Sequence, residues 1–205
     1  MESLSYVFVF LISVSNSLLI VLSKPLHARF SADTVQGDQK FHKGTVPRIG
    51  GVAIAISLLA GWFFFLRDFL LAQILLGSVP LFITGFWEDI FKSVSSFRRL
   101  LAAIISSILF IYLTGTYFTS VDVYFFDMVF SALYLFPILT IITIAALSNA
   151  INIIDGFNGL ASGSVIFMAL AIAYLGYQND DILVLQFALL FAASVAGFFV
   201  VNFPR

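Results

Sequence analysis

Long stretches without a charged residue recur along this chain. Seven of them have between 18 and 27 residues free of Asp, Glu, Lys and Arg, and about 20 apolar residues are enough for an α-helix to cross the hydrocarbon core of a bilayer. Strands of a transmembrane β-barrel would alternate apolar and polar residues, which these stretches do not. The sequence therefore predicts an all-α, polytopic membrane protein with about seven transmembrane helices, at residues 4–23, 49–66, 69–87, 100–119, 130–150, 160–178 and 182–202.

The composition supports this class and excludes several others. Of all residues, 61% are hydrophobic and only 10% are charged, whereas a soluble domain has about 25% charged residues. These values exclude a soluble enzyme, a disordered tail, a nucleic-acid-binding protein and a disulfide-stapled secreted domain. Because the chain has no cysteine, a disulfide, a thiolate zinc site and a cysteine nucleophile are excluded as well.

The basic residues predict the orientation in the membrane. All but Arg67 fall on one side of the predicted helices: Lys24, Arg29, Lys40, Lys43, Arg48, Lys92, Arg98, Arg99 and Arg205. Since Lys and Arg accumulate in cytoplasmic loops, we expect this side to be cytoplasmic, with the N-terminus outside and the C-terminus in the cytoplasm. No linker or shift in composition interrupts the chain, so residues 1–205 are interpreted as a single transmembrane domain.

A first group of polar residues precedes the second predicted helix, in the segment HKGTVPRIGG at 42–51. Pro47 and the Gly50–Gly51 pair provide a turn and allow close approach of a ligand to a helix N-terminus. With Lys43 and Arg48 beside it, such a helix end can bind an anion. The alternative is that the glycines serve helix packing and the cations only fix the topology.

A second group joins the third and fourth predicted helices, in the segment GFWEDIFKSVSSFRR at 85–99. Glu88 and Asp89 are adjacent carboxylates at the membrane edge, and their mutual repulsion would be relieved by a proton or a divalent cation. Oxygen ligands suit Mg²⁺ or Mn²⁺. The alternative is a solvated cytoplasmic turn, in which Arg98 and Arg99 act as topology anchors.

A third group, SNAINIIDGFNGLASG at 148–163, is the most specific of the three. Polar residues recur every third position, which places them on one stripe of a helix that leads out of the membrane: Asn149, Asn152, Asp155 and Asn158. Gly156 and Gly159 then end the helix. Because amides and carboxylates are costly at a membrane boundary unless they face a cavity or a partner, this series indicates a functional site.

All three groups lie on the predicted cytoplasmic side, which suits a phosphorylated, metal-bound substrate from the cytosol and a second reactant from the bilayer. A secondary transporter or channel, the alternative class, usually has polar groups near the midplane. There the predicted helices contain only Asn16, Gln73 and Gln186 as strongly polar residues, and these are interpreted as interhelical hydrogen-bond partners.

The motifs PRIGG at 47–51, GFWEDI at 85–90 and NAINIIDGFNGLASG at 149–163 resemble those of the polyprenyl-phosphate N-acetylhexosamine-1-phosphate transferases, over essentially the whole chain. The short loops look more like the branch that starts O-antigen, enterobacterial common antigen or teichoic-acid synthesis than the muramoyl-pentapeptide branch. The resemblance implies transfer of N-acetylhexosamine 1-phosphate from a UDP-N-acetylhexosamine to polyprenyl (undecaprenyl) phosphate. It further implies Mg²⁺ (or Mn²⁺) as cofactor, the cytoplasmic face of a bacterial inner membrane, and association as a homodimer.

The resemblance also assigns roles to residues. Asp89 matches the second of the family's paired aspartates, and Glu88, one methylene longer, stands where many members have the first. Glu88, Asp89 and Asp155 are then expected to be catalytic, with Asp89 and Asp155 as metal ligands. The expected substrate-binding residues, of which the two basic ones would face the diphosphate, are Lys43, Arg48, Asn149, Asn152, Asn158, Gly156 and Gly159.

The acceptor's ionisation bears on the role of Asp89. A phosphate monoester has a second pKa near 6 and is about 90% dianionic at pH 7, so removing a proton from it contributes little. Bringing two anionic phosphates together demands charge neutralisation and alignment instead. We therefore expect Asp89 to be a metal ligand or positioning group rather than an obligatory base.

The chain departs from the family after VNFPR at 201–205. Family members normally continue with a Gly-Asp motif, further helices and a basic, His-containing cytoplasmic loop, so the chain looks like the N-terminal two-thirds of such an enzyme. We expect little transfer by residues 1–205 alone. A non-catalytic remnant of the family is the remaining alternative.

Overall fold

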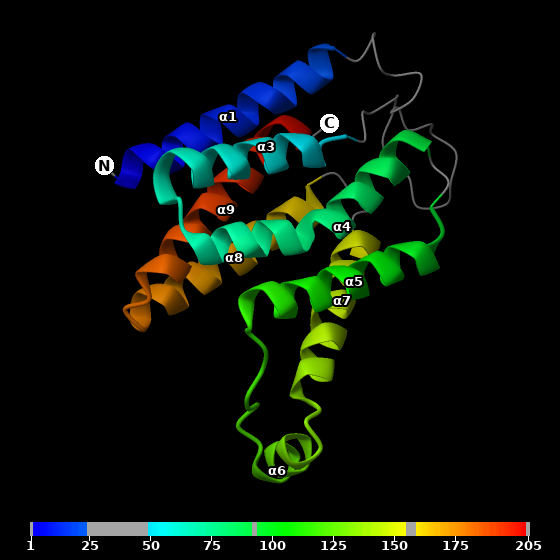
Figure 1. Ribbon diagram of the computed structural model, residues 1–205. Helices are drawn as coiled ribbons and strands as arrows, with labels where there is room; N and C mark the ends of the chain where they lie inside the picture. Colours follow the sequence, from blue (N-terminus) through cyan, green and yellow to red (C-terminus); the bar gives the residue numbers. More distant parts are fainter. Residues whose placement is uncertain (1, 24–48, 92–93, 155–158, 204–205) are drawn as a thin grey trace. The chain divides into compact units, whose positions relative to one another are not determined.

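The computed structural model describes residues 2–23, 49–91, 94–154 and 159–203, and within these ranges the regular structure is entirely helical. Figure 1 shows the elements in chain order: α1 (Glu2–Leu22), α3 (Gly51–Gly61), the π-helical turn η1 (Trp62–Leu66), α4 (Phe69–Phe91), α5 (Ser96–Thr114), α6 (Tyr124–Ala132), α7 (Phe136–Ile154), α8 (Leu160–Gln178) and α9 (Ile182–Asn202).

Six of these helices are long and apolar enough to span a membrane, which confirms a polytopic helical membrane protein: α1, α4, α5, α7, α8 and α9. The second predicted span corresponds to the shorter apolar helix Gly51–Leu66, whose length of about 24 Å falls below a typical hydrocarbon thickness of about 30 Å. It ends at Arg67, which has the left-handed φ of 47° and whose backbone N–H bonds to the carbonyl of Trp62.

The prediction of a span at 130–150 was wrong at its start. The chain forms the short helix α6, turns at Tyr134 with a φ of 53°, and begins α7 only at Phe136. Pro137 is the second residue of α7. Backbone N–H groups in the first turn of a helix have no acceptor within the helix, so proline costs no helical hydrogen bond there. Pro80, in contrast, does lie inside α4.

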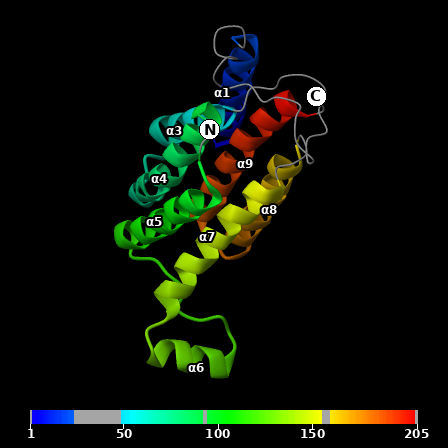
Figure 2. The same ribbon diagram turned by 90° about the vertical axis from the view of Figure 1, so that its right-hand side faces the viewer.

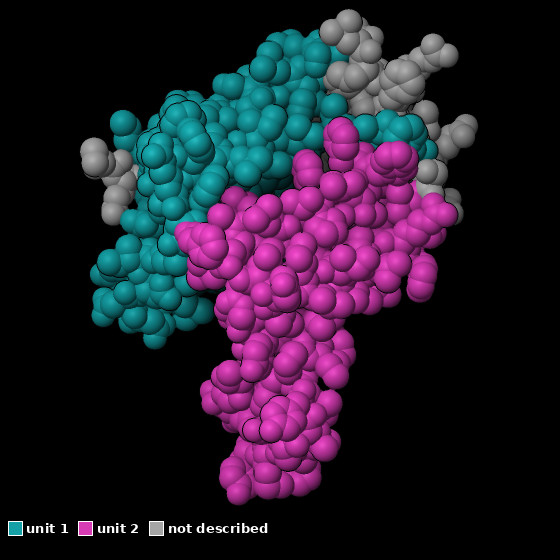
Figure 3. All heavy atoms as spheres, viewed as in Figure 1, with its two compact units in different colours: residues 1–68, 89–91, 153–205 teal, residues 69–88, 92–152 magenta. Residues whose placement is uncertain are grey.

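The chain divides into two compact units, which are coloured separately in Figure 3. Unit 1 contains residues 1–68, 89–91 and 153–205, and unit 2 contains residues 69–88 and 92–152. The divisions at 88/89 and 152/153 fall inside the second and third polar groups. Each unit is described by itself below.

In unit 1, α9 packs against α1, α3 and α8 through small residues, including the buried Ala188, Ala192 and Ser194. Figure 2 shows α8 and α9 side by side. Gly197 lies so close to α1 that an added Cβ would be 2.6 Å from the carbonyl oxygen of Phe10. Small side chains let membrane helices pack this closely. In the bilayer, van der Waals contacts between helices take the place of the hydrophobic effect as the driving force for association.

Three buried serines join α1, α3 and α9. Ser13 donates its hydroxyl to the carbonyl of Ser194 at 2.6 Å, and the hydroxyls of Ser57 and Ser194 are 2.6 Å apart. The Ser194 hydroxyl also lies 3.1 Å from the carbonyl oxygen of Ile54, to which it donates. Each hydroxyl thus has a partner within the helix cluster, as polar groups in an apolar environment require.

These contacts fix the helix directions within unit 1. Ser13 faces Ser194, and both Val9 and Leu190 lie beside Gly61, so α1 and α9 run parallel while α3 runs opposite to both. Parallel spanning helices require an odd number of crossings between them. Among the described residues between them, five helices long or apolar enough to cross supply an odd number if the short helix Gly51–Leu66 also crosses, as the seven predicted spans require: α3–η1, α4, α5, α7 and α8.

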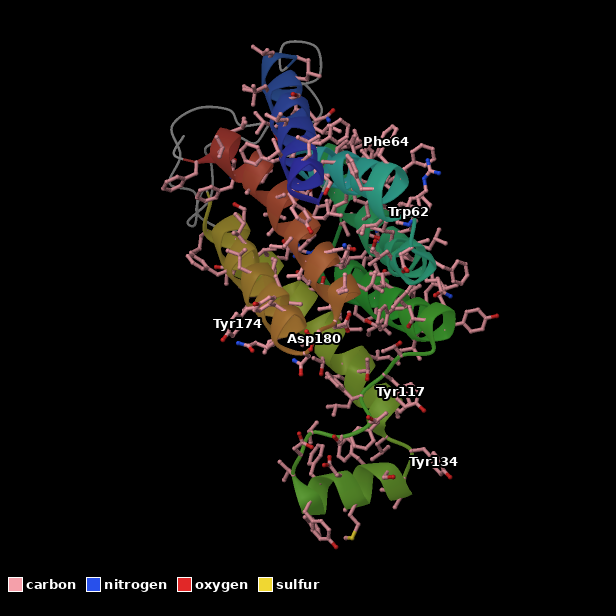
Figure 4. All side chains as sticks on the ribbon, turned by 90° about the vertical axis from the view of Figure 1, so that its left-hand side faces the viewer. Trp62, Phe64, Tyr117, Tyr134, Tyr174 and Asp180 are labelled. Atoms are coloured by element: carbon pink, nitrogen blue, oxygen red, sulfur yellow. The ribbon has the colours of Figure 1, made fainter. Side chains whose placement is uncertain are left out.

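The end of unit 1 opposite to the start of α3 has features of a membrane–water boundary, where Trp and Tyr concentrate. Trp62 donates from Nε1 to the carbonyl of Asp68 at 2.8 Å, and Tyr174 accepts from Gln178 at 2.6 Å. Figure 4 labels Trp62 and Tyr174 together with Asp180 in the turn between α8 and α9. This end carries the acidic turn that the orientation prediction places outside.

Unit 2 is built on the antiparallel pair α4 and α5. Gln73 donates to the carbonyl of Leu113, which confirms it as an interhelical partner. Asn16 of α1 donates to the carbonyl of Ile12 in its own helix, and among the described residues it has no interhelical partner. Near Pro80, the Leu81 N–H donates to the Ser106 hydroxyl of α5 at 3.0 Å. The Thr140 hydroxyl of α7 accepts a hydrogen bond from the N–H of Phe118 at 2.9 Å, which connects the start of α7 to the segment after α5.

Candidate functional site

Two glycine motifs converge on the last turns of α9 in unit 1. An added Cβ at Gly50 would overlap the Phe198 ring, and one at Gly159 would meet Phe203 at 2.7 Å and Phe199 at 3.0 Å. The starts of α3 and α8 therefore lie at one end of unit 1. This agrees with the prediction that the first and third polar groups share a side.

Gly159 is buried and precedes α8 with a φ of 85°. Residues with a Cβ rarely adopt this backbone conformation, so the turn requires glycine. The Gly159 carbonyl accepts from the Gly163 N–H at 2.8 Å as the first helical bond of α8. Lys43, Arg48, Asp155, Gly156 and Asn158 lie outside the described residues.

Glu88 and Arg99 form an ion pair between the end of α4 and the start of α5 in unit 2. Nη1 of Arg99 donates to Oε1 at 2.9 Å and to Oε2 at 3.2 Å, and Nη2 donates to the Ser96 hydroxyl at 3.2 Å. Both ionic side chains are about one-quarter exposed, at 25% for Glu88 and 27% for Arg99. The guanidinium thus neutralises Glu88 in this arrangement.

This pair could not be read from the sequence alone, where Arg99 was interpreted as a topology anchor. Helix boundaries were the missing information: α5 begins at Ser96, about one turn before the predicted start at 100. Ser95 caps it by accepting from the N–H of Arg98. With α4 and α5 antiparallel, an acid at the end of one helix and a base at the start of the next come together.

Asp89 is half-buried in the last turn of α4. Oxygen ligands such as carboxylates suit a divalent cation. Both oxygens of the preceding acid, Glu88, accept hydrogen bonds from Arg99. The residues that the structure describes contain no cluster of three metal-ligating side chains, and the expected second ligand, Asp155, lies outside them. The metal-ligand role of Asp89 therefore stays a prediction.

Asn149 and Asn152 lie in the last two turns of α7, three residues apart on one face. Asn149 is half-buried and Asn152 is exposed. Within the described part of the chain, neither side chain hydrogen-bonds to Glu88. Their amides can donate and accept hydrogen bonds, as recognition of a polar ligand requires.

Comparison with known proteins assigns the family. The model of glycosyl transferase family 4 matches residues 71–205. A probable undecaprenyl-phosphate N-acetylglucosaminyl 1-phosphate transferase from Bacillus subtilis is 27% identical over 197 residues, which cover 95% of this chain and 54% of the relative.

Two further relatives come from other organisms. A putative UDP-N-acetylglucosamine--dolichyl-phosphate N-acetylglucosaminephosphotransferase from Sulfolobus acidocaldarius is 29% identical, over 80% of this chain and 53% of the relative. A phospho-N-acetylmuramoyl-pentapeptide-transferase from Streptococcus pyogenes is 30% identical, with the same two coverages of 80% and 53%. The chain spans about half the length of these curated relatives. The family match extends over α4 to α9 and includes both acidic motifs, and the chain belongs to glycosyl transferase family 4.

Proposed function

We propose that this chain takes part in the transfer of N-acetylhexosamine 1-phosphate from a UDP-N-acetylhexosamine to a polyprenyl phosphate in the membrane. The observation that carries the proposal is the family match over residues 71–205, supported by relatives named as transferases with these substrates. The distribution of Lys and Arg supports an orientation with the N-terminus outside and the reaction at the cytoplasmic face, and the relative from Bacillus subtilis supports a bacterial inner membrane.

The reaction joins two phosphates. An oxygen of the polyprenyl phosphate dianion attacks the β-phosphorus of the UDP-sugar, and the bond from this phosphorus to the bridging oxygen breaks. UMP leaves with the electron pair, so the exchange of one P–O bond for another is balanced without a proton transfer. Mg²⁺ (or Mn²⁺), when bound, neutralises the diphosphate charge.

The residues of this chain divide into three roles under the proposal. Asp89, together with Asp155, holds the cation and aligns the diphosphate. Asn149, Asn152 and Asn158 bind the nucleotide end through their amides, while Lys43 and Arg48 bind the diphosphate. Gly159, with its φ of 85°, lets the backbone before α8 approach the ligand, and Gly156 is assigned to the same ligand.

Glu88 has a different part in this scheme. Because its carboxylate is bound to Arg99 at 2.9 Å, it stabilises the end of α4 on which Asp89 lies. Its extra methylene relative to aspartate lengthens the reach toward α5. The site then needs Glu88 as a positioning residue rather than as a metal ligand.

Binding and transfer are tested separately with the purified chain in detergent. Titration calorimetry with UDP-N-acetylglucosamine, with and without Mg²⁺, is expected to show Mg²⁺-dependent binding that Asp89→Asn weakens about tenfold or more. Asp122→Asn is the matched control, since the exposed Asp122 lies in the loop between α5 and α6. Equal affinity for the wild type and Asp89→Asn would contradict the assignment of Asp89.

Transfer is followed as UMP release and as radiolabelled sugar phosphate on undecaprenyl phosphate. Should Asp89→Asn keep its Mg²⁺ affinity but lose turnover, with rescue at higher pH, Asp89 would be a base rather than a ligand. Absence of both nucleotide binding and transfer would favour the non-catalytic remnant.

A further inference from the structure

An open groove lies between the second half of α4 and the first half of α5, inside unit 2. Its volume is about 390 Å³, and Pro80, Trp87, Leu101 and Ile105 contribute to its apolar lining. Among the described residues that line it, Arg98 carries the one charge. The groove therefore combines an apolar channel with a single cation.

The position of Arg98 gives the groove a polar end and an apolar end. Arg98 lies in the first turn of α5, and Ile105 follows seven residues later, which is about 10 Å along a helix. The distribution of Lys and Arg predicts that the start of α5 lies at the cytoplasmic membrane surface. The groove then runs from the headgroup level into the hydrocarbon region.

The two neighbouring arginines differ in their partners. Arg99 binds Glu88, whereas Arg98 is exposed and its guanidinium has no carboxylate partner among the described residues. The positive end of the α5 dipole adds to the charge at this point. An anion at the membrane surface complements this arrangement, and an apolar chain attached to it complements the groove.

We propose that the groove binds one acyl chain of an anionic phospholipid from the surrounding bilayer, with the lipid phosphate paired to Arg98. The polyprenyl phosphate acceptor fits less well, because a phosphate about to react needs metal-binding carboxylates beside it. No carboxylate occurs among the described lining residues, and the neighbouring Glu88 is held by Arg99. This lipid site is separate from the proposed transfer reaction.

Native mass spectrometry of the full chain in detergent tests the proposal, with dioleoyl phosphatidylglycerol and dioleoyl phosphatidylcholine as probes. One phosphatidylglycerol is expected to bind about fivefold more tightly than phosphatidylcholine. This is the gain in affinity that one basic residue near a membrane surface gives for an anionic lipid. Arg98→Gln should abolish this preference, and Arg98→Lys should largely keep it. Arg67→Gln is the matched control, because it removes the same charge on the side predicted to be outside.

A second variant tests the apolar part of the groove. Ile105 is 47% exposed, so Ile105→Trp can fill the groove without entering a buried core, and it should reduce phosphatidylglycerol retention about fivefold with Arg98 intact. Circular dichroism and gel filtration check that each variant folds. Equal losses in Arg98→Gln and Arg67→Gln, or no loss in Ile105→Trp, would overturn the proposal. Displacement of phosphatidylglycerol by equimolar undecaprenyl phosphate would assign the groove to the acceptor instead and also overturn it.

Discussion

Arg99 binds both carboxylate oxygens of Glu88 through one nitrogen, at 2.9 and 3.2 Å, and so joins the end of α4 to the start of α5. In the sequence, Glu88 and Asp89 are adjacent acids whose repulsion calls for a proton or a cation. The guanidinium relieves this repulsion within the protein itself. The role of Asp89 as a metal ligand stays a prediction.

The first prediction concerns the strength of this ion pair. Replacing Arg99 by Ala leaves Glu88 about three-quarters buried without its partner, and we expect a loss of about 1–2 kcal/mol in stability. A double-mutant cycle with Glu88→Ala, followed by thermal unfolding in detergent, should give a coupling energy of about 1 kcal/mol. Arg98→Ala is the control and should show no coupling to Glu88. Additive effects of Glu88→Ala and Arg99→Ala would show that the pair contributes nothing measurable.

The second prediction concerns the packing of α1 on α9. In Gly197→Ala, the new Cβ would lie 2.6 Å from both the Phe10 carbonyl oxygen and Ser13 Cβ, so the two helices must move apart. We expect a destabilisation of about 2 kcal/mol, or a drop of about 4–8 °C in Tm. Gly85→Ala is the matched control within a helix, because its Cβ would meet no atom within 4 Å. A smaller drop for Gly197→Ala than for Gly85→Ala would contradict this packing.

The third prediction concerns the turn before α8. Gly159→Ala must adopt a φ of 85° and also bring a Cβ to 2.7 Å from Phe203, and the backbone conformation alone costs about 1–2 kcal/mol. Gly163→Ala, four residues later, makes an ordinary contact of 3.6 Å with Phe199 and should be neutral or slightly stabilising. Thermal unfolding of the two variants side by side distinguishes them. Equal Tm values would mean that the turn does not require glycine.

The sequence predicted the helices well where charge marks their ends. The start of α9 follows Asp181, which caps the helix by accepting from the N–H of Val184, and the predicted span 182–202 matches its bounds. The span at 130–150 failed because the apolar run continues through the turn at Tyr134. Pro137 was the available signal, since proline favours the first turn of a helix.

For the candidate site, the sequence predicted where the described polar residues lie but not how they pair, and their roles stay predictions. Asn149 and Asn152 lie at the end of a helix as expected. The sequence could not decide whether Arg98 or Arg99 faces Glu88, because the choice depends on the rotation of α5 about its axis. Consecutive residues on a helix point about 100° apart. This difference in direction places Arg99 in the ion pair with Glu88 and Arg98 in the groove.

The last prediction concerns Asn152, whose exposed amide lies in the final turn of α7. Replacing it by Ala removes no hydrogen bond within the described residues, so the Tm should stay within about 1–2 °C. If the amide binds the nucleotide, UDP-N-acetylglucosamine affinity should fall about five- to tenfold, the value of one net hydrogen bond of about 1–1.5 kcal/mol. Asn179→Ala is the matched control, because Asn179 is exposed after α8, on the side that the sequence predicts to be outside, and bonds to Leu175 at 2.8 Å. Titration calorimetry on both variants separates the two roles: a loss confined to Asn152→Ala places this face of α7 in the nucleotide site, and equal affinities would remove it from that site.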